Sequence, residues 1–319
     1  MSATATKIEY LTSIGIVGFR GIASGTLEKL TPLTILVGPN GCGKTTILEA
    51  LQLGTSRLPQ EVLQQCIADR GGREARWLIH NTEHRAIIEV RTSKSTPIVT
   101  ILQQSPANAN QLQIVTEYQG RSLNSQRDPS IEILPAALVD AQVTKSSNNT
   151  YLQNLYTKAV ELGRRSFAQE IVTTVIPGAR GIEILTEFSN PIIHIVFDDG
   201  SVPLSLVGDG IQRVLRIALE LASRQSGTVL LEEPEVFQHP RSIRQTAKIL
   251  RLSTRRGMQV ILSTHSIELI DAILDEADPI DLEQLSIYRL RLEKGQLHTS
   301  RLDGNDAKFA RKQIEDDLR

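Results

Sequence analysis

The amino-acid sequence predicts an α/β fold with a mostly parallel central sheet. Near the N-terminus, a strongly apolar run at 30–37 is followed by a glycine-rich turn and then by helical spacing. After residue 204, segments with helix and strand patterns alternate. These segments are helix 211–225, strand 228–231, helix 241–256, strand 259–264 and helix 266–277. Such alternation is typical of parallel βαβ units, because each helix returns the chain to begin a strand in the same direction.

The middle of the chain has a different pattern. Three short β-rich runs at 84–93, 96–105 and 111–120 predict an antiparallel meander, and a helical pattern covers 150–176. We therefore expect one domain over 1–319, with an antiparallel β subdomain and a helical insertion. In this division 1–60 and 200–319 form the core, 83–142 is the β-rich part and 143–200 is the mainly helical part.

The composition is that of a globular protein with little charge bias. The chain has 319 residues, 40% of them hydrophobic, and a formal net charge of −1, which gives no general attraction to nucleic acid or anionic membranes. No apolar run approaches the ~20 residues that cross a bilayer, and the segment MSATATKIEY lacks the apolar stretch of a secretory signal. With only two cysteines, Cys42 and Cys66, we expect no disulfide framework and a reducing cytoplasmic location. Because no apolar run is long enough to cross a bilayer, we also expect no membrane partner.

A phosphate-binding loop is the most specific motif in the sequence. Residues 38–45 match GxxxxGK[ST], with an apolar strand before them and a helical pattern after them. In such a loop backbone N–H groups converge on phosphate oxygens; Lys44 would reach the β- and γ-phosphates, and Thr45 would bind Mg²⁺. The alternative is a glycine-rich turn with an exposed lysine, which the flanking strand and helix disfavour. The expected ATP-binding residues are Gly38, Pro39, Asn40, Gly41, Cys42, Gly43, Lys44, Thr45 and Thr46.

Two acids follow a later apolar strand. Glu232 and Glu233 come directly after TVLL, whose unbroken apolar character indicates a strand buried on both faces. We expect Glu232 to hold the water shell of Mg²⁺ and Glu233 to polarise the water that attacks the γ-phosphate. A solvated acidic turn is the alternative for this pair.

A histidine stands at the corresponding place one βα unit later. His265 follows the strand QVILST at the edge where parallel sheets bind their ligands. It is expected to hydrogen-bond the γ-phosphate or the attacking water, and a purely structural histidine is the alternative. Together with Lys44 and Glu233, His265 makes up the expected catalytic set.

These motifs together resemble the ABC-type ATPases that are not transporters, the SMC, Rad50, RecF and OLD-like group, and within it the AAA15/AAA21-type ATPases. The resemblance extends over nearly the whole chain and implies the fold of a P-loop NTPase of the ABC-ATPase type. The segments that carry it are Gly18 to Ile22, Gly38 to Thr45, Pro203 to Gly210, Leu231 to Glu235 with His239 and Pro240, and Ser263 to Ser266.

The resemblance also implies a head-to-tail homodimer that closes on ATP. Each ATP would lie between the phosphate loop of one subunit and a signature segment of the other, here Ser205, Gly208, Asp209 and Gly210. This segment departs from the family pattern, because Gly208 stands where serine is usual and Asp209 replaces a glycine. Gln142 is our candidate for the glutamine that such sites place near the metal, and a surface glutamine is an equal alternative.

Several functions fit these motifs. The first is an ATPase switch that controls a separate effector protein, such as a nuclease or toxin in anti-phage defence. The alternative is a RecF-like repair ATPase with DNA as its partner, for which two arginine clusters, 70–76 and 251–256, are the only sequence support. The altered signature argues against a transporter subunit and keeps an ATP-binding scaffold without turnover open. Cys42 at a helix N-terminus suggests a reactive thiol, against the simpler interpretation of a small tolerated side chain.

Overall fold

The computed structural model describes residues 10–68, 75–80, 84–93, 96–105, 108–119, 121–124, 137–140, 148–187, 189–224, 227–236 and 238–318. The strands of the large sheet are β1 (Leu11–Phe19), β2 (Ile22–Glu28), β3 (Leu33–Val37), β4 (Arg85–Thr92), β5 (Ile98–Ser105), β6 (Asn108–Tyr118), β7 (Arg121–Asn124), β8 (Ala137–Asp140), β12 (Gly227–Glu232), β13 (Met258–Ser263), β14 (Leu285–Glu293) and β15 (Gln296–Asp303). The small sheet contains β9 (Gly181–Glu187), β10 (Asn190–Phe197) and β11 (Gly200–Pro203). The α-helices are α1 (Lys44–Thr55), α2 (Pro59–Ala68), α3 (Asn148–Glu161), α4 (Arg165–Val175), α5 (Asp209–Ala222), α6 (Pro240–Arg255), α7 (Ile267–Glu276), α8 (Pro279–Glu283) and α9 (Gly304–Gln313), with 3-10 turns at Ala75–Leu78 and Leu204–Leu206.

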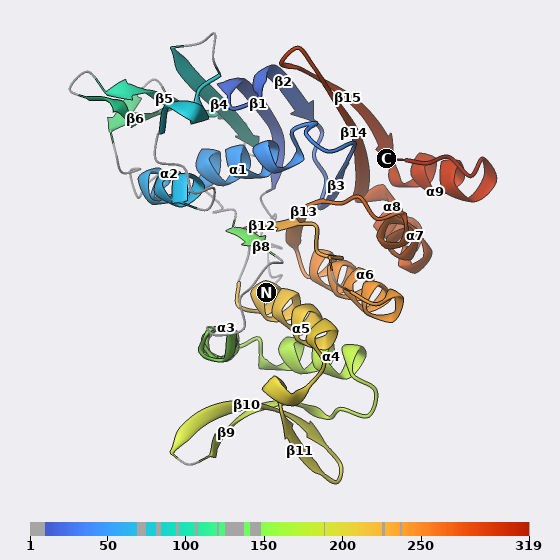
Figure 1. Cartoon of the computed structure of the whole chain (residues 1–319). Coiled ribbons are helices and arrows are strands. Elements are labelled where there is room, and N and C mark those ends of the chain that lie inside the picture. Colours follow the sequence, from blue (N-terminus) through green and yellow to red (C-terminus); the bar gives the residue numbers. More distant parts are fainter. Residues whose placement is uncertain are drawn as a thin grey trace, which may run out of the picture.

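The large sheet has a parallel half and an antiparallel half. In the described part of the chain its strand order is β7-β6-β5-β4-β1-β2-β15-β14-β3-β13-β12-β8. Strands β14, β3, β13, β12 and β8 run parallel to one another, whereas the strands from β7 to β2 pair antiparallel. Helix α1 contacts strands of both halves, among them β4 and β12, so the sheet curves around it (Figure 1). The antiparallel strands thus continue the parallel sheet and enclose the helix that follows the phosphate loop.

The parallel strands are buried on both faces. In β3, Leu36 packs into the core around α1, whereas Ile35 and Val37 pack into the core formed with the helices on the opposite face. In the same way, Leu230 and Leu231 of β12 belong to opposite cores. This two-sided burial explains why the strand sequences are apolar without alternation.

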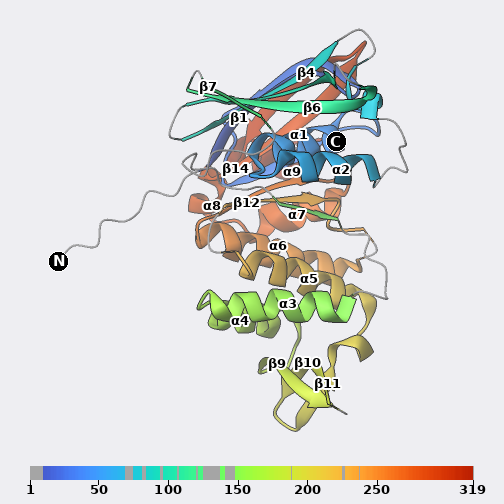
Figure 2. The same cartoon turned by 90° about the vertical axis from the view of Figure 1, so that its left-hand side faces the viewer.

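Helices form successive layers on the other face of the parallel strands. Figure 2 shows α6, α5 and then α3 with α4 below β12, and the small sheet β9–β11 at the far end of the molecule from α1. The pattern at 211–225 predicted the helix α5, which packs against α6 and against α3 and α4. No helix of the described residues is long and apolar enough to span a membrane.

Two further segments of the chain have mixed or short patterns. The mixed pattern at 57–80 corresponds to α2 over Pro59–Ala68 and a 3-10 turn at Ala75–Leu78. The apolar runs after residue 181 pair as the hairpin of β9 and β10, and β11 adds a third strand. In both places local periodicity identified the type of element but not its extent, which is decided by packing.

One buried side chain joins the two halves of the sheet. Gln259 in β13 is 1% exposed. Its Oε1 accepts hydrogen bonds from the Leu11 backbone N–H at 2.8 Å and the Thr228 hydroxyl at 2.9 Å, and its Nε2 donates to the carbonyl oxygens of Leu11 at 2.8 Å and Thr31 at 3.2 Å. The amide thus satisfies backbone groups at the start of β1, next to the parallel strands.

Replacing Gln259 with leucine is expected to lower the free energy of unfolding by about 2–4 kcal/mol, because several buried donors and acceptors lose their partners. Equilibrium unfolding in urea measures the change. Gln313→Leu on the exposed face of α9 is the matched control and should leave the unfolding midpoint almost unchanged. Equal midpoints for the two variants would show that the Gln259 network contributes no net stability.

Candidate active site

The phosphate loop is shaped by glycines that no other residue can replace. It connects the end of β3 at Val37 with the start of α1 at Lys44. Gly38 has φ 146°, and a Cβ atom there would lie 2.5 Å from the carbonyl oxygen of Leu290. Gly43, the N-cap of α1, has φ 100°. These backbone conformations favour glycine, and they leave the first N–H groups of α1 open toward a ligand.

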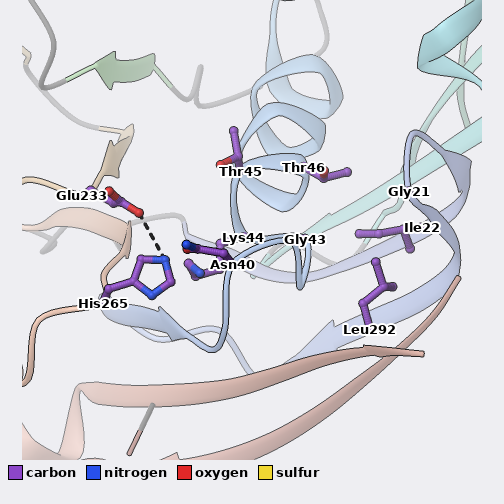
Figure 3. A pocket seen from close by; sticks show the side chains of 11 residues that line it. Gly21, Ile22, Asn40, Gly43, Lys44, Thr45, Thr46, Glu233, His265 and Leu292 are labelled. Carbon is purple, nitrogen blue, oxygen red and sulfur yellow. Dashed lines mark ion pairs between the residues drawn. The ribbon is translucent and has the colours of Figure 1, made fainter. Parts of the chain in front are cut away.

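A cavity of about 250 Å³ lies over this loop. Figure 3 shows its two ends: Lys44, Asn40, Glu233 and His265 gather at one, and Ile22 and Leu292 lie at the other. The cavity therefore has a charged end and an apolar end. Its lining residues are Gly21, Ile22, Asn40, Gly41, Gly43, Lys44, Thr45, Thr46, Glu233, His265 and Leu292.

Lys44 is held inside the loop that it belongs to. The side chain is 6% exposed, and its Nζ donates to the carbonyl oxygens of Gly38 at 2.8 Å and Pro39 at 3.2 Å. Burial lowers the pKa of Lys44 below its ordinary value, and the nearby Cys42, Glu233 and Glu232 oppose that shift. The ammonium group therefore lacks full hydration and has weak neutral acceptors, which an anionic ligand would improve.

The two adjacent glutamates face different partners. Glu232 ends β12, and its carboxylate accepts a hydrogen bond from the Thr45 hydroxyl. Glu233 follows with φ 43°, a left-handed conformation that strains a non-glycine residue by about 1–3 kcal/mol. Its N–H donates to the carbonyl oxygen of Ser263 at 3.0 Å, which holds the chain in this turn. The turn separates two side chains that are neighbours in sequence.

His265 completes the charged end. Its Nε2 lies 3.3 Å from Glu233 Oε1, and the two side chains are 32% and 37% exposed. Both groups are thus open to water and substrate. The backbone before α7 is fixed by Ser266, whose hydroxyl caps the helix by accepting from the N–H of Leu269. The histidine is therefore placed by the end of β13 and the start of α7.

A third acid supports this segment from behind. Glu235 Oε1 accepts hydrogen bonds from the Thr264 hydroxyl at 2.5 Å and the His265 N–H at 3.2 Å. Burial raises the pKa of Glu235, while these hydrogen bonds oppose the shift and the charge of Glu233 adds to it. In the sequence, Glu235 was part of the segment Leu231 to Glu235 that carries the family resemblance, but no role was predicted for it.

The donor atoms suit a hard cation. The Thr45 hydroxyl lines the cavity and donates a hydrogen bond to the Glu232 carboxylate. Magnesium in nucleotide sites uses one or two protein oxygens together with phosphate oxygens and water. Thr45 and Glu232 therefore fit Mg²⁺, whereas Gln142 lies outside the described residues.

The structure does not bring every expected residue to the cavity. Gly38 and Pro39 contribute the carbonyls that hold Lys44, and Cys42 is buried beneath the loop at 3% exposure. Burial raises the pKa of Cys42 and the charge of nearby Lys44 opposes this shift, which favours the interpretation of a small tolerated side chain over that of a reactive thiol.

The expected signature segment lies elsewhere in the molecule. Ser205, Gly208, Asp209 and Gly210 are at the start of α5, and none of them lines this cavity. Gly208 is the N-cap of α5 and Asp209 is its first residue, so Asp209 does not cap the helix. Asp209 contributes a negative charge to the first turn instead, where the helix dipole tolerates it.

Sequence reasoning missed the apolar end of the cavity. Gly21 and Ile22 come from the turn between β1 and β2, and Leu292 comes from β14, far away in sequence. An ion pair between Arg20 and Glu49 joins this turn to α1. The segment Gly18 to Ile22 was recognised only as part of a resemblance, and Leu292 had no local signal.

A family model described as "AAA domain, putative AbiEii toxin, Type IV TA system" matches residues 78–271. The match covers more than half of the chain and includes Glu233 and His265. The chain therefore belongs to this AAA_21 family, and its recognition as an OLD-like ATPase of the ABC type is confirmed.

Named relatives extend this result. An OLD nuclease of Thermus scotoductus is 25% identical over 293 residues, which cover 74% of this chain and 55% of the nuclease, so the chain spans about half of that relative. An ATP/GTP phosphatase of Helicobacter pylori is 21% identical over 335 residues, covering 84% of this chain and 89% of the phosphatase. The DNA replication and repair protein RecF of Gloeobacter violaceus is 40% identical over 68 residues, 21% of this chain and 18% of RecF.

Solved structures confirm the fold. An Smc head bound to the C-terminal winged-helix domain of ScpA has a TM-score of 0.63 at 14% identity, covering 92% of this chain and 98% of that chain. The SMC head domain of Thermotoga maritima has a TM-score of 0.58 at 15% identity, covering 92% and 99%. The fold is thus the α/β fold of SMC-type ATPase heads, as the sequence predicted.

The lowered pKa of Lys44 predicts how nucleotide affinity depends on pH. Below this pKa the side chain is an ammonium ion and attracts phosphate; as the pH rises through it, the charge is lost. The affinity for ATP should therefore begin to fall at a pH below 10.5, the ordinary lysine value. Equilibrium titration across a pH series measures this. Lys44→Arg keeps its charge throughout, so any affinity that it retains should lack the fall; a wild-type affinity that stays flat to pH 10.5 would contradict the prediction.

Proposed function

We propose that this chain is a Mg²⁺-dependent ATPase that works as a dimerising switch for a partner effector. The observation that carries the proposal is the pairing at the charged end of the cavity. Thr45 contacts Glu232, whereas His265 lies 3.3 Å from Glu233. One acid is thereby assigned to the metal and the other to the attacking water.

The cavity would hold ATP along its length. The phosphates fit the end with Lys44 and the α1 N-terminus, where backbone N–H groups and an ammonium ion favour anions. The nucleobase fits the end with Ile22 and Leu292, whose side chains offer apolar contact. Mg²⁺, bound by Thr45 and through water by Glu232, would neutralise the phosphate charge and let it approach the acids.

Glu233 and His265 supply the proton chemistry. The Glu233 carboxylate accepts a proton from a water molecule as the water oxygen bonds to the γ-phosphorus and the bond to the bridging oxygen of ADP breaks. His265 contacts Glu233, and from there it would orient the carboxylate or hydrogen-bond the γ-phosphate. Lys44 stabilises the negative charge on the transferred group.

The dimer supplies the switch. Ser205, Gly208 and Asp209 are exposed at the N-terminus of α5, and Leu206 beside them is 76% exposed. We infer that this face covers the ATP site of a second copy in a head-to-tail arrangement. The N–H groups at the α5 N-terminus would then meet the γ-phosphate, and ATP would be enclosed between the two subunits.

The effector is inferred from relatives. The family description names a toxin of a toxin–antitoxin system, and an OLD nuclease matches over 74% of this chain. One Smc head neighbour is bound to a domain of another protein, ScpA. We propose that a separate nuclease or toxin reads the ATP-closed dimer in the cytoplasm as part of anti-phage defence.

DNA binding, as in RecF, is the second candidate, favoured by the local RecF match. The three arginines of the cluster at 251–256 give it little support, whereas Arg70 and Arg73 of the other cluster lie outside the described residues. Arg251 and Arg255 pair with Asp278 and Asp281, and Arg256 pairs with Glu170.

ATP-dependent, salt-sensitive binding to plain duplex DNA would favour the repair function, whereas the effector proposal expects no binding at low salt. Electrophoretic mobility shift over a salt series decides between them.

Replacing Glu233 with glutamine is expected to lower kcat by about 10²- to 10⁴-fold, the usual contribution of a general base. Nucleotide affinity should change by no more than about threefold, since the side chain is not needed in the ground state. The variant should also accumulate as a dimer in ATP and Mg²⁺, measured by light scattering after size-exclusion chromatography.

Glu283→Gln removes an exposed acid on α8 and is the control. It should hydrolyse ATP at the wild-type rate and should not trap a dimer. A Glu233→Gln variant with wild-type turnover would refute the role of Glu233. A variant that is inactive but stays monomeric would refute the switch while leaving the ATPase proposal standing.

A further inference from the structure

We propose that Glu235 is a positioning residue for the hydrolytic step, which acts by holding His265 against Glu233. This inference rests on the proposed ATPase function and assigns a further residue to it. Its basis is the pair of hydrogen bonds from Thr264 and His265 to one carboxylate oxygen.

A hydrogen-bonded loop after β12 carries Glu235. The loop after Glu233 is fixed at both ends. The Val236 N–H donates to the carbonyl oxygen of Glu233 at 3.1 Å, and Gln238 Nε2 donates to the carbonyl oxygen of Pro234 at 2.6 Å. The Thr246 hydroxyl on α6 in turn donates to Gln238 Oε1 at 2.8 Å. Glu235 therefore projects from a loop that is bound to α6.

The Glu235 carboxylate accepts hydrogen bonds from the segment after β13. Thr264 donates its hydroxyl proton to Glu235 and accepts from the Ser266 N–H at 2.9 Å through the same oxygen. The Thr264 N–H donates to the carbonyl oxygen of Leu36 at 3.1 Å. The His265 N–H is the remaining donor between them, and Glu235 accepts it. Glu235 thus fixes the backbone from which the imidazole projects.

The position of His265 also determines its contact with Glu233. This acid precedes Glu235 by two residues, and its carboxylate meets His265 at 3.3 Å. The loop after β12 therefore contacts His265 twice. Glu235 binds its backbone N–H, and Glu233 contacts its ring. Losing the backbone contact would free the ring to move relative to Glu233, and a shift of about 1 Å can lower a rate on the order of 100-fold.

The two oxygens of the Glu235 carboxyl group have different surroundings. Glu235 Oε2 is buried and has no hydrogen-bond partner in the described part of the chain. The hydrogen bonds from Thr264 and His265 therefore both end on Oε1. A glutamine can accept the same two hydrogen bonds with its amide oxygen, whereas an alanine leaves both donors without an acceptor. The two substitutions separate hydrogen-bond acceptance from the presence of any side chain.

The test is a double-mutant cycle on the full chain with ATP and Mg²⁺. We expect Glu235→Ala to lower kcat about 10- to 100-fold with little change in KM, because the ATP-binding groups are untouched. Glu235→Gln should recover kcat to within about threefold of wild type, since the acceptor is kept. Because Glu235 acts through His265, adding Glu235→Ala to His265→Ala should lower kcat no further. Glu283→Ala is the control for removal of an acid elsewhere.

The inference is overturned if the losses in the two single variants multiply in the double variant, if His265→Ala alone has no effect, or if Glu235→Ala raises KM alone. A purely structural role would give such additive losses or a lower unfolding midpoint. Should Glu235→Ala fail to fold, Thr264→Val removes one of the two donors and should give a smaller loss of kcat; an unchanged kcat would then refute the inference. A wild-type chain without turnover would instead refute the proposed function, and the inference with it.

Discussion

The register of three parallel strands is the constraint on which the site depends. Glu232 of β12 lies opposite Ser263 of β13, and Ser263 lies opposite Leu36 of β3. The chain therefore leaves all three strands at the same edge of the sheet, where the phosphate loop, the glutamates and His265 begin. A slip of one residue would exchange the faces of every side chain in a strand, and the two cores would lose their complementary surfaces. Apolar packing on both faces thus sets the positions of the polar groups beyond the strand ends.

The charges at the site favour an anion together with a cation. Lys44 and the N-terminus of α1 form a positive end, where a desolvated ammonium group contacts only neutral loop carbonyls. Glu233 lines the same cavity, and Glu232 contacts Thr45, which also lines it. In the proposed function, a divalent cation held by Thr45 and Glu232 would reduce the repulsion between these acids and a bound phosphate. The proposed ligand is therefore a metal–nucleotide complex rather than the nucleotide alone.

Much of this arrangement could be predicted because it is encoded locally. The loop 38–45, the strand end at Glu232, the strand end before Thr264 and the helix patterns after them each occupy a short stretch of sequence. The apolar end of the cavity could not be predicted, because Ile22 and Leu292 meet only after the sheet curves around α1. The role of Glu235 was hidden for a similar reason. Its hydrogen bonds join segments that are 29 and 30 residues apart, and no periodicity reports such a contact. Burial also raises the pKa of Cys42, which its position before a helix N-terminus does not reveal.

The backbone between β12 and α6 explains how three acids within four positions come to have different surroundings. Glu232 is still part of the strand, so its side chain follows the pleat and reaches Thr45. The left-handed conformation of Glu233 then reverses the direction of the chain and points its carboxylate into the cavity toward His265. After the buried Pro234, the chain turns Glu235 toward the backbone of Thr264 and His265. The strain at Glu233 is offset by the hydrogen bond from its N–H to Ser263, which is itself fixed by the strand register. The same register that aligns the strand ends therefore also maintains the turn that separates the acid in contact with Thr45 from the acid beside His265.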